Sequence, residues 1–433
     1  MDLLLERQLF LHGALPAAEL AAFLKVSQPT ISRRLARMGN RIVRIGRGRS
    51  TRYALAREVP PVGSSWPLYR IDEQGRPHLA GTLRALQRRQ WALEQSEPWP
   101  TLTGEHDFPN GLFPDLPWFL YDLRPQGFLG RTFARTFGKQ LNLPHDPTRW
   151  NADDILRALV QYGSDLPGAW VIGEPMLAEV QSARLQPPDF IHEDEREAAY
   201  PRLAEAALAG EWPGSSAGGE QPKFTARVGT SPDDIRHVIV KFSGNRNRPE
   251  DQRWADLLVA EHIAAKVLAR HGIPAAETKI IRAGNRVFLE STRFDRIGAH
   301  GRRHVVSLMS LDGAFFGAPH TPWTAAAQRL QAGGWLSNED ADHLQILWWF
   351  GNLIGNTDMH YGNVSLFLEP ERPLRLSPSY DMLPMHYRPD VHGNLPEGDF
   401  TPAPPPPEAL PLWEIASAAA REFWKWIGKE GNI

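Results

Sequence analysis

The spacing of apolar positions near the start of the chain predicts two short helices joined by a tight turn. In residues 16–24 and again in residues 28–38, apolar side chains recur at i, i+3 and i+4 spacing, which places them on one face of a helix. Only "KVS" separates the two segments. Ser27 is the predicted N-cap of the second helix, Pro29 falls in its first turn, where a missing N–H costs nothing, and Gly39 is expected to end it.

A basic hairpin is predicted directly after the second helix. "RIVRIGRGRSTRYAL", residues 41–55, supplies strand-forming positions on both sides of the turn "GRGRS". Two helices joined by a tight turn and followed by a hairpin form the winged helix-turn-helix arrangement. Its second helix enters the major groove and its hairpin contacts phosphates. An amphipathic helix pair with a solvated basic face is the alternative. The residues predicted to contact double-stranded DNA are Ser27, Gln28, Thr30, Ser32, Arg33, Arg34, Arg47 and Arg49.

The middle of the chain contains patterns that predict secondary structure but no motif that predicts a chemical function. "EVPPVGSSWP", residues 58–67, is rich in proline and is interpreted as a linker. A hairpin turning at Gln74–Gly75 is predicted next. It is followed by an aromatic-rich stretch over residues 114–138 and by a helix with Asn151 as its N-cap. We interpret this region as scaffold.

Composition and charge change this picture at one point. A chain of 433 residues with a net charge of −2 is long enough for two or three domains and is not uniformly basic. The segment Lys25–Arg57, however, holds ten Lys and Arg residues and no acidic residue, which supports the DNA-binding prediction. The absence of cysteine excludes disulfides and thiolate metal sites. Charged Glu6 and Arg7 interrupt the first apolar run, and no uncharged apolar stretch approaches the roughly 20 residues of a membrane span. We expect a cytoplasmic protein with no membrane partner.

Glycine and serine cluster before a short strand pattern in "GSSAGGEQPKFTARV", which starts at residue 214. Glycines let backbone N–H groups approach phosphate oxygens, and hydroxyl groups add further donors. The stretch lacks the GK[ST] ending of a Walker A sequence. It predicts a phosphate-binding loop, with a flexible turn as the alternative.

A lysine and a glutamate interrupt the apolar patterns that follow this loop. Lys241 lies in the predicted strand "RHVIVKFSG", where a buried charge needs an anionic partner; an exposed lysine on an edge strand is the alternative. Glu261 lies in the apolar middle of the predicted helix "WADLLVAEHIAAKVLARHGIP" and is its candidate partner. A glycine-rich loop, a strand lysine, a helix glutamate and then "VFLESTRFDRIG" follow the order of a protein-kinase nucleotide-binding lobe.

Candidate catalytic chemistry lies in "GNLIGNTDMHYGN", residues 351–363. Phosphoryl transfer from ATP needs a carboxylate that orients and deprotonates the attacking hydroxyl, and oxygen ligands that hold Mg²⁺. Asp358 is the predicted carboxylate, and Asn363, five residues later, and Asp381, after a predicted strand pair, are the predicted magnesium ligands. A metal-dependent hydrolase that uses Asp358 and His360 is one alternative, and a structural polar loop is another.

These stretches together resemble the HipA family of serine/threonine kinases, which act as toxins in bacterial toxin–antitoxin systems. "SSAGGEQPK" is similar to that family's phosphate-binding loop, "VIVKFS" to its ATP-lysine strand and "AEHIAAKVLARHGIP" to the helix of the glutamate partner. "RFDR" is similar to the lobe connector, "TDMHYGN" to the catalytic loop and "SPSYDML" to the magnesium loop. "GSDLPGAW" is like a shorter stretch of the family. The resemblance covers roughly residues 70–433.

The resemblance implies an α+β, bilobal, protein-kinase-like fold that uses ATP and Mg²⁺ and phosphorylates protein serine or threonine. Together with the first helices it predicts a DNA-binding domain over residues 1–58, an N-lobe with a HipA-type N-terminal subdomain over 59–292 and a mostly helical C-lobe over 293–433. Ser216 occupies the place of the family's autophosphorylated serine. The expected ATP-binding residues are Lys241, Glu261, Ser215, Ser216, Gly218, Gly219, Lys223, Phe294, His360 and Tyr380.

Two departures from the family pattern concern partners and substrate. HipA proteins usually rely on a separate antitoxin to bind DNA, whereas this chain carries its own predicted winged helix, so a separate antitoxin is left open. "RRHVVSLMSLDG", residues 302–313, differs in polarity from the family's corresponding segment, so substrate choice is expected to differ. A homodimer is a further expectation. A transcriptional regulator whose kinase-like region only senses nucleotide or mediates dimerisation is the alternative function.

Overall fold

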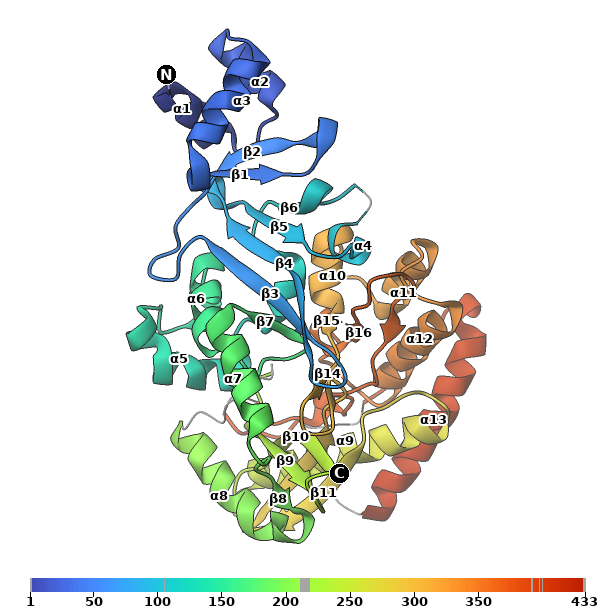
Figure 1. The fold of residues 1–433 in the computed structure, drawn as a ribbon. Helices are drawn as coiled ribbons and strands as arrows, with labels where there is room; N and C mark the ends of the chain where they lie inside the picture. Colours follow the sequence, from blue (N-terminus) through green and yellow to red (C-terminus); the bar gives the residue numbers. More distant parts are fainter. Residues whose placement is uncertain are drawn as a thin grey trace.

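The computed structural model describes residues 2–104, 106–210, 219–390, 392–396, 398 and 400–430. An N-terminal module projects from one end, a five-stranded antiparallel sheet follows, and a second five-stranded sheet and a group of helices form the rest (Figure 1). The strands of both five-stranded sheets pair antiparallel, except for β8 with β9, and helices pack beside them, so the predicted α+β class is confirmed. Within these residues no helix combines the length and the apolar character needed to cross a membrane.

Helices and a hairpin form the N-terminal module, as the apolar spacing predicts. Its elements are α1 (Asp2–His12), α2 (Ala17–Leu24), α3 (Gln28–Arg37), β1 (Ile42–Ile45) and β2 (Arg52–Leu55). Their core includes the fully buried Leu5, Leu20 and Ile31. Ser27 precedes α3 as predicted, but its hydroxyl lies 2.9 Å from the Thr30 hydroxyl and accepts no backbone N–H.

The hairpin β1–β2 lies between the helices of this module and the middle sheet. Val43, Ile45 and Ala54 pack in one buried cluster with Leu86 and Ala92 of the middle part. The chain then passes into β3 without a long free segment, since β3 begins at residue 65. The interpretation of residues 58–67 as a linker is therefore wrong at its C-terminal end, where an alternating burial pattern makes the segment part of a sheet.

The middle part is an antiparallel sheet with the strand order β6-β5-β4-β3-β7. The predicted hairpin is β3–β4, and the predicted Asn151 cap is present as a capping box with Asp154. The strands are β3 (Ser65–Ile71), β4 (Pro77–Ala85), β5 (Trp91–Gln95), β6 (Leu112–Phe113) and β7 (Trp170–Ile172). The helices are α4 (Pro100–Thr103), α5 (Gly127–Leu141), α6 (Ala152–Tyr162) and α7 (Glu174–Leu185).

The second five-stranded sheet has the order β11-β12-β10-β9-β8. Strand β10, which carries Lys241, pairs with β9 on one side and β12 on the other, so the edge-strand alternative for this lysine is wrong. The strands are β8 (Ile191–His192), β9 (Lys223–Gly229), β10 (Ile235–Phe242), β11 (Thr278–Ala283) and β12 (Arg286–Thr292). The helices are α8 (Arg196–Ala209) and α9 (Pro249–Arg270).

The C-terminal part adds short strands and a helical group. A pair of strands between Asn363 and Asp381 was predicted, and β16 and β17 form it. The strands are β13 (Arg296–Ile297), β14 (Gly301–Arg302), β15 (Val305–Ser307), β16 (Ser365–Phe367) and β17 (Arg375–Leu376). The helices are α10 (Leu308–Phe315), α11 (Trp323–Ala332), α12 (Asn338–Leu353) and α13 (Leu410–Glu430).

The largest apolar core joins the middle sheet to the C-terminal helices. Trp118 after β6 contacts Phe315 of α10 with ring centroids 5.3 Å apart, and the same buried cluster continues to Phe423 of α13. The second sheet packs on α8 through a smaller core of its own around Tyr200 and Phe224. The middle sheet is thus held against the helices that carry the predicted catalytic loop.

Candidate active site

One cavity of 1510 Å³ lies between the second sheet and the C-terminal helices. Asp358, Asn363 and Asp381, which the sequence predicts to act together, all line it. The predicted nucleotide-binding residues within the described part of the chain line it too. They are Gly219, Lys223, Lys241, Glu261, Phe294, His360 and Tyr380. Residues that are up to 162 positions apart in the sequence therefore meet at one place.

Lys241 and Glu261 form a buried ion pair across the cavity wall. Strand β10 carries the lysine and α9 the glutamate, and the lysine Nζ lies 2.7 and 2.9 Å from the two carboxylate oxygens. Both side chains are almost completely buried. Lys241 also contacts the Asp381 carboxylate. The predicted pairing of Lys241 with Glu261 is thus present. The contact of Lys241 with Asp381 also connects the second sheet to the segment that follows β17.

A second lysine lies directly opposite the first. Lys223 on β9 is the cross-strand partner of Lys241 in the antiparallel register, and its exposed fraction is 3%. Burial, with the neighbouring Lys241 charge, lowers the pKa of the Lys223 ammonium to about 7. Two cations on one face of a sheet disfavour each other, so this site suits a ligand with several negative charges.

The segment before Lys223 is anchored on α5. The Gly219 carbonyl accepts a hydrogen bond of 2.9 Å from the Phe128 N–H. A Cβ atom on Gly127 would come within 2.3 Å of that carbonyl oxygen, so glycine is required there for the close approach. Ser215, Ser216 and Gly218 of the predicted phosphate-binding loop lie outside the described residues.

The predicted catalytic loop follows α12 and is held by its own polar groups. The Asn363 side-chain amide donates to the Asp358 carbonyl at 2.9 Å, which closes the loop across the five-residue spacing. The Asp358 N–H donates to the Asn356 side-chain oxygen at 3.0 Å. The Gly362 N–H donates to His360 Nδ1 at 3.0 Å, and His360 Nε2 lies 3.9 Å from the Asp358 carboxylate. His360 thus shapes the loop from within.

Asn356 links this loop to the segment of Asp381. It is buried, and its side-chain nitrogen donates to the Asp381 carbonyl at 3.4 Å. Asp381 adopts a backbone φ of +54°, which is uncommon for a residue with a side chain. No role was predicted for Asn356 from the sequence. Its burial beside two predicted functional residues could not be read from the spacing.

Aromatic side chains form another wall of the cavity. The Phe294 ring lies 5.7 Å from the Tyr380 ring and 6.0 Å from the Phe367 ring. The Tyr380 hydroxyl donates to the Gly362 carbonyl at 3.1 Å and lies 2.7 Å from the Ser365 hydroxyl. Burial raises the pKa of this hydroxyl above its ordinary value, so Tyr380 is neutral and holds the wall in place.

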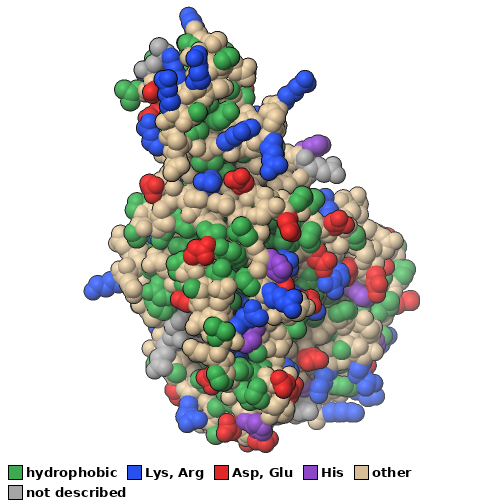
Figure 2. Space-filling view, in the orientation of Figure 1, with side chains coloured by type: hydrophobic (Ala, Val, Ile, Leu, Met, Phe, Trp, Pro, Cys, Tyr) green, Lys and Arg blue, Asp and Glu red, His purple; other side chains and the backbone are tan. Residues whose placement is uncertain are grey.

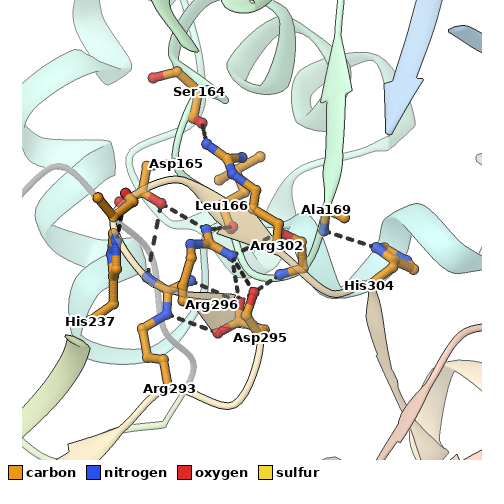
Figure 3. Close-up of polar contacts among 12 residues, drawn as sticks. Ser164, Asp165, Leu166, Ala169, His237, Arg293, Asp295, Arg296, Arg302 and His304 are labelled. Carbon is orange, nitrogen blue, oxygen red and sulfur yellow. Dashed lines mark hydrogen bonds and ion pairs between the residues drawn. The ribbon is translucent and has the colours of Figure 1, made fainter. Parts of the chain in front are cut away.

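A buried cluster of charged groups from the "GSDLPGAW" and "RFDR" stretches joins the middle part to residues 293–302 (Figure 3). Arg296 Nη2 lies 2.7 Å from Asp165 Oδ1 and also donates to the Leu166 carbonyl. Arg296 Nη1 donates to the Gly168 carbonyl at 2.9 Å. One guanidinium therefore fixes residues 165–168, which belong to the family-like stretch "GSDLPGAW".

Arg293 and Asp295 complete the cluster. Arg293 donates from two nitrogens to the two Asp295 oxygens, each at 2.9 Å, and the Gly168 N–H donates to Asp295 at 2.8 Å. Burial alone would raise the pKa values of Asp165 and Asp295. The charges of the surrounding arginines outweigh this effect and hold both pKa values below their ordinary range. Both carboxylates are therefore charged. Arg293 and Asp295 also line the cavity on either side of Phe294.

Two histidines beside the cluster stay neutral. Burial lowers the pKa values of His237 and His304 to about 3. The Ala169 N–H donates to His304 Nδ1 at 3.2 Å, a bond that only an unprotonated nitrogen can accept. Arg302 donates to the Ser164 carbonyl at 2.7 Å, and burial lowers its pKa to about 9.

The residues predicted to contact DNA lie on α3 and on the tip of the hairpin. Figure 2 shows Lys and Arg side chains distributed over the N-terminal module. Thr30 and Arg34 are only half-exposed, and one terminal nitrogen of Arg34 is buried. Arg34 therefore faces partly toward its own domain, because it lies one turn from the buried Ile31. The exposed members are Ser27, Gln28, Ser32, Arg33, Arg47 and Arg49.

No group of three or more His, Asp or Glu side chains within the described segments is arranged to hold a metal ion. The metal-dependent hydrolase alternative requires further ligands beside Asp358 and His360, and the described residues place no such group around them. Asn363 and Asp381 both line the cavity and offer it oxygen ligands.

Comparison with known proteins identifies the family. The family model "YjjJ-like toxin, middle domain" matches residues 62–181, and the model "HipA-like C-terminal domain" matches residues 215–403. "Toxin YjjJ" of Escherichia coli strain K12 is 39% identical over 430 residues, which cover 98% of this chain and 93% of that protein. The chain belongs to the YjjJ-like toxin family. The HipA-like resemblance inferred from its motifs is confirmed.

The fold is similar to that of a solved HipA. That structure is described as the "Shewanella oneidensis MR-1 Toxin Antitoxin System HipA, HipB and its operator DNA complex". It matches with a TM-score of 0.55 and 17% sequence identity, covering 84% of this chain and 89% of that chain. At this identity the match concerns the fold alone, and it supports the predicted bilobal, HipA-type fold.

Proposed function

We propose that this chain is a serine/threonine protein kinase of the HipA type that uses ATP and Mg²⁺. The observation that carries the proposal is the meeting of Asp358, Asn363 and Asp381 in one cavity with the buried Lys241–Glu261 pair. A hydroxyl-orienting carboxylate, magnesium ligands and a phosphate-binding lysine held by a glutamate are the parts that phosphoryl transfer requires.

The residues present fit a magnesium–nucleotide complex. Two opposed lysines, Lys223 and Lys241, suit a polyanion, and the oxygens of Asn363 and Asp381 suit a hard cation. When bound, magnesium–ATP supplies the phosphoryl group and neutralises charge on it. Asp358 then orients the acceptor hydroxyl and takes its proton. The aromatic wall around Phe294 and Tyr380, together with His360, bounds the nucleotide site.

We further propose a cellular role as a toxin that restrains growth and binds double-stranded DNA. The curated relative in Escherichia coli carries the name toxin, and HipA of Shewanella oneidensis was solved with HipB and operator DNA. In this chain the exposed side chains of α3 and the basic hairpin tip give a DNA-binding surface of its own. This surface supports direct DNA binding by the chain, and a separate antitoxin is not needed for that contact.

Labelled ATP tests the kinase proposal. Purified protein is incubated with Mg²⁺ and ATP labelled on its γ-phosphate, and the labelled residue is located by mass spectrometry. We expect label on Ser216 in the wild type and none in Asp358→Ala. Asp342→Ala, which removes an exposed carboxylate on α12, is the matched control and should label like the wild type. Equal labelling of Asp358→Ala and the wild type contradicts the proposal.

Phosphorylation of Ser216 is proposed to lower activity. A phosphate group adds up to two negative charges, which compete with the nucleotide phosphates for the same cationic groups. The protein labelled to completion should therefore transfer phosphate to an acceptor more slowly than Ser216→Ala does. Equal rates would rule out this regulation while leaving the kinase activity intact.

Salt dependence tests the DNA-binding proposal. The probe is a duplex that covers the region upstream of the gene for this chain, titrated at several salt concentrations. Arg47→Ala and Arg49→Ala should each reduce the slope of log affinity against log salt by about 1. Arg149→Ala, an exposed arginine of the middle part, should leave the slope unchanged. DNA binding by a wild type that transfers no phosphate would favour the regulator alternative.

A further inference from the structure

The active-site cavity extends well beyond the residues that a nucleotide needs. Its volume of 1510 Å³ exceeds the roughly 300–1,000 Å³ of a site for one small ligand. Beyond the predicted nucleotide-binding residues, its lining includes Phe113, Leu116, Trp118 and Tyr121 of the middle part and Met309 and Ala314 of α10, and we call this part of the cavity the compartment. The compartment therefore lies at the junction of two matched regions, residues 62–181 and 215–403.

This compartment adjoins the part of the active site where the phosphate would be transferred to the acceptor. The Leu308 N–H, at the start of α10, donates to the Val364 carbonyl at 2.8 Å. Val364 directly follows the proposed magnesium ligand Asn363, and Met309 directly follows Leu308. Strand β15 also pairs with β16, which continues from Val364. The apolar compartment is thus adjacent to the loop on which an acceptor hydroxyl would react.

The walls of the compartment are held rigidly. The Asp122 carboxylate accepts hydrogen bonds from the Ser307 N–H at 2.6 Å, the Ser307 hydroxyl at 2.7 Å and the Ser310 hydroxyl at 2.8 Å. These bonds tie the start of α10 to the turn of Trp118–Leu123. The Trp118 and Phe315 rings pack edge to face. The compartment is therefore formed before any ligand binds.

The carboxylates of this compartment are already bonded within the protein. Asp122 has its three partners, and Asp115 at the rim accepts from the Leu116 N–H at 2.8 Å and from the Tyr121 hydroxyl at 3.3 Å. Carboxylates that are satisfied in this way compete poorly for a cationic side chain. Besides the Arg124 side chain, which also lines the cavity, the compartment offers a ligand apolar surface.

Met309 is an accessible apolar side chain of the compartment. It is 41% exposed, and among the strongly exposed large apolar residues in the described part of the chain it alone lines the cavity. An unbranched, polarisable side chain at a cavity wall adapts its shape to an apolar partner. Its position beside the transfer centre indicates contact with the acceptor.

We propose that this compartment is an acceptor subsite that receives an apolar side chain, aliphatic or aromatic, close to the phosphorylated serine or threonine of the substrate protein. Asp122 acts as a positioning residue that holds α10, and Met309 contacts the acceptor and sets specificity. This inference rests on the proposed kinase function and deepens it.

A positional peptide library tests the subsite. Peptides with a central serine and one varied flanking position are phosphorylated with Mg²⁺ and ATP. We expect at least one position at which leucine or phenylalanine is preferred over lysine or aspartate by about tenfold in kcat/KM. Met309→Asp should reduce that preference to about threefold or less, whereas Met309→Leu should keep it. The KM for ATP should stay the same in both variants.

The control is Leu79→Asp, which places the same charge at an apolar residue of similar exposure, 48%, outside the cavity. It should keep the wild-type preference. A wild type without apolar preference at any position, or a Met309→Asp enzyme that retains it, overturns the subsite while self-phosphorylation shows that the kinase function stands. An absence of transfer to every peptide and to Ser216 overturns both.

Discussion

The Arg296 guanidinium and the Asp165 carboxylate form an ion pair of 2.7 Å between residues 131 positions apart in the sequence (Figure 3). Asp165 belongs to the segment before β7, and Arg296 begins β13 two residues after Phe294. The Arg296 side chain is 2% exposed and that of Asp165 is 31% exposed. The pair thus connects the middle part to the residues that form one wall of the active site.

Replacing Asp165 by asparagine should destabilise the protein substantially. Arg293, Arg296 and Arg302 would then share the single Asp295 carboxylate, and a buried charge that loses its partner costs about 3 kcal/mol. Denaturant unfolding measures this loss as a lower midpoint with an unchanged slope. The control is Glu369→Gln, which breaks the exposed pair with Arg375 and should cost less than about 1 kcal/mol. Equal losses in the two variants would show that the cluster does not have this structural role.

Asn356 is expected to be needed for the rate rather than for nucleotide affinity. Its side chain bonds to the backbone of both Asp358 and Asp381, so Asn356→Ala would release both loops from each other. A displacement of about 1 Å at reacting groups lowers rates by about 100-fold. Steady-state kinetics should show a fall in kcat of that order with little change in the KM for ATP.

The matched control for this variant is Asn352→Ala. Asn352 lies one turn earlier on α12 and bonds only within its own helix, to the Trp348 carbonyl at 2.8 Å, apart from a 4.0 Å contact with the Met359 sulfur. Its kcat should stay within about threefold of the wild type. An equal fall in both variants would indicate a general loosening of α12 instead of a specific link between the two loops.

The sequence predicted those parts of the site whose chemistry is local. Lys241 interrupts an apolar strand, Glu261 interrupts an apolar helix, and Asp358 and Asn363 share one loop, so each is visible in a short window. Their order along the chain then indicated a kinase-type lobe, and the family resemblance supplied further expected site residues. Domain boundaries at residues 58 and 292 and the functional roles of the site residues stay predictions.

The remaining parts depend on contacts that no short window contains. Asp165 and Arg296 lie 131 positions apart in the sequence and meet only once the middle part has packed against the segment that follows β12. The acceptor compartment needs the turn of Trp118 beside α10, which a single aromatic-rich stretch does not specify. Residues 58–67 look like a linker in composition, but the packing of β3 makes the last of them part of a sheet.

Nucleotide affinity should depend on pH through Lys223. In the free protein its pKa is about 7, and phosphate binding favours the charged ammonium, so the pKa is higher in the complex. At pH values between these two pKa values, nucleotide binding is accompanied by proton uptake on Lys223. The affinity for the nucleotide should therefore fall as the pH rises from 7 to 9. Lys223→Arg keeps its charge over this range.

This effect is measured by titrating the protein with ATP in the presence of Mg²⁺ at a series of pH values. The wild type should lose affinity above pH 7, and Lys223→Arg should lose much less. Because both proteins meet the same ligand, titration of the nucleotide itself cancels in the comparison. Parallel pH profiles would show that the Lys223 ammonium does not take part in binding.

The most direct test of the central claim is the rate of phosphate transfer by Asp358→Asn, an isosteric change that removes only the carboxylate charge. The variant should unfold like the wild type and bind ATP with similar affinity. Its kcat should fall at least about 100-fold, because a general base contributes that much or more. A kcat within about threefold of the wild type would contradict the assignment of Asp358 as the group that accepts the acceptor proton.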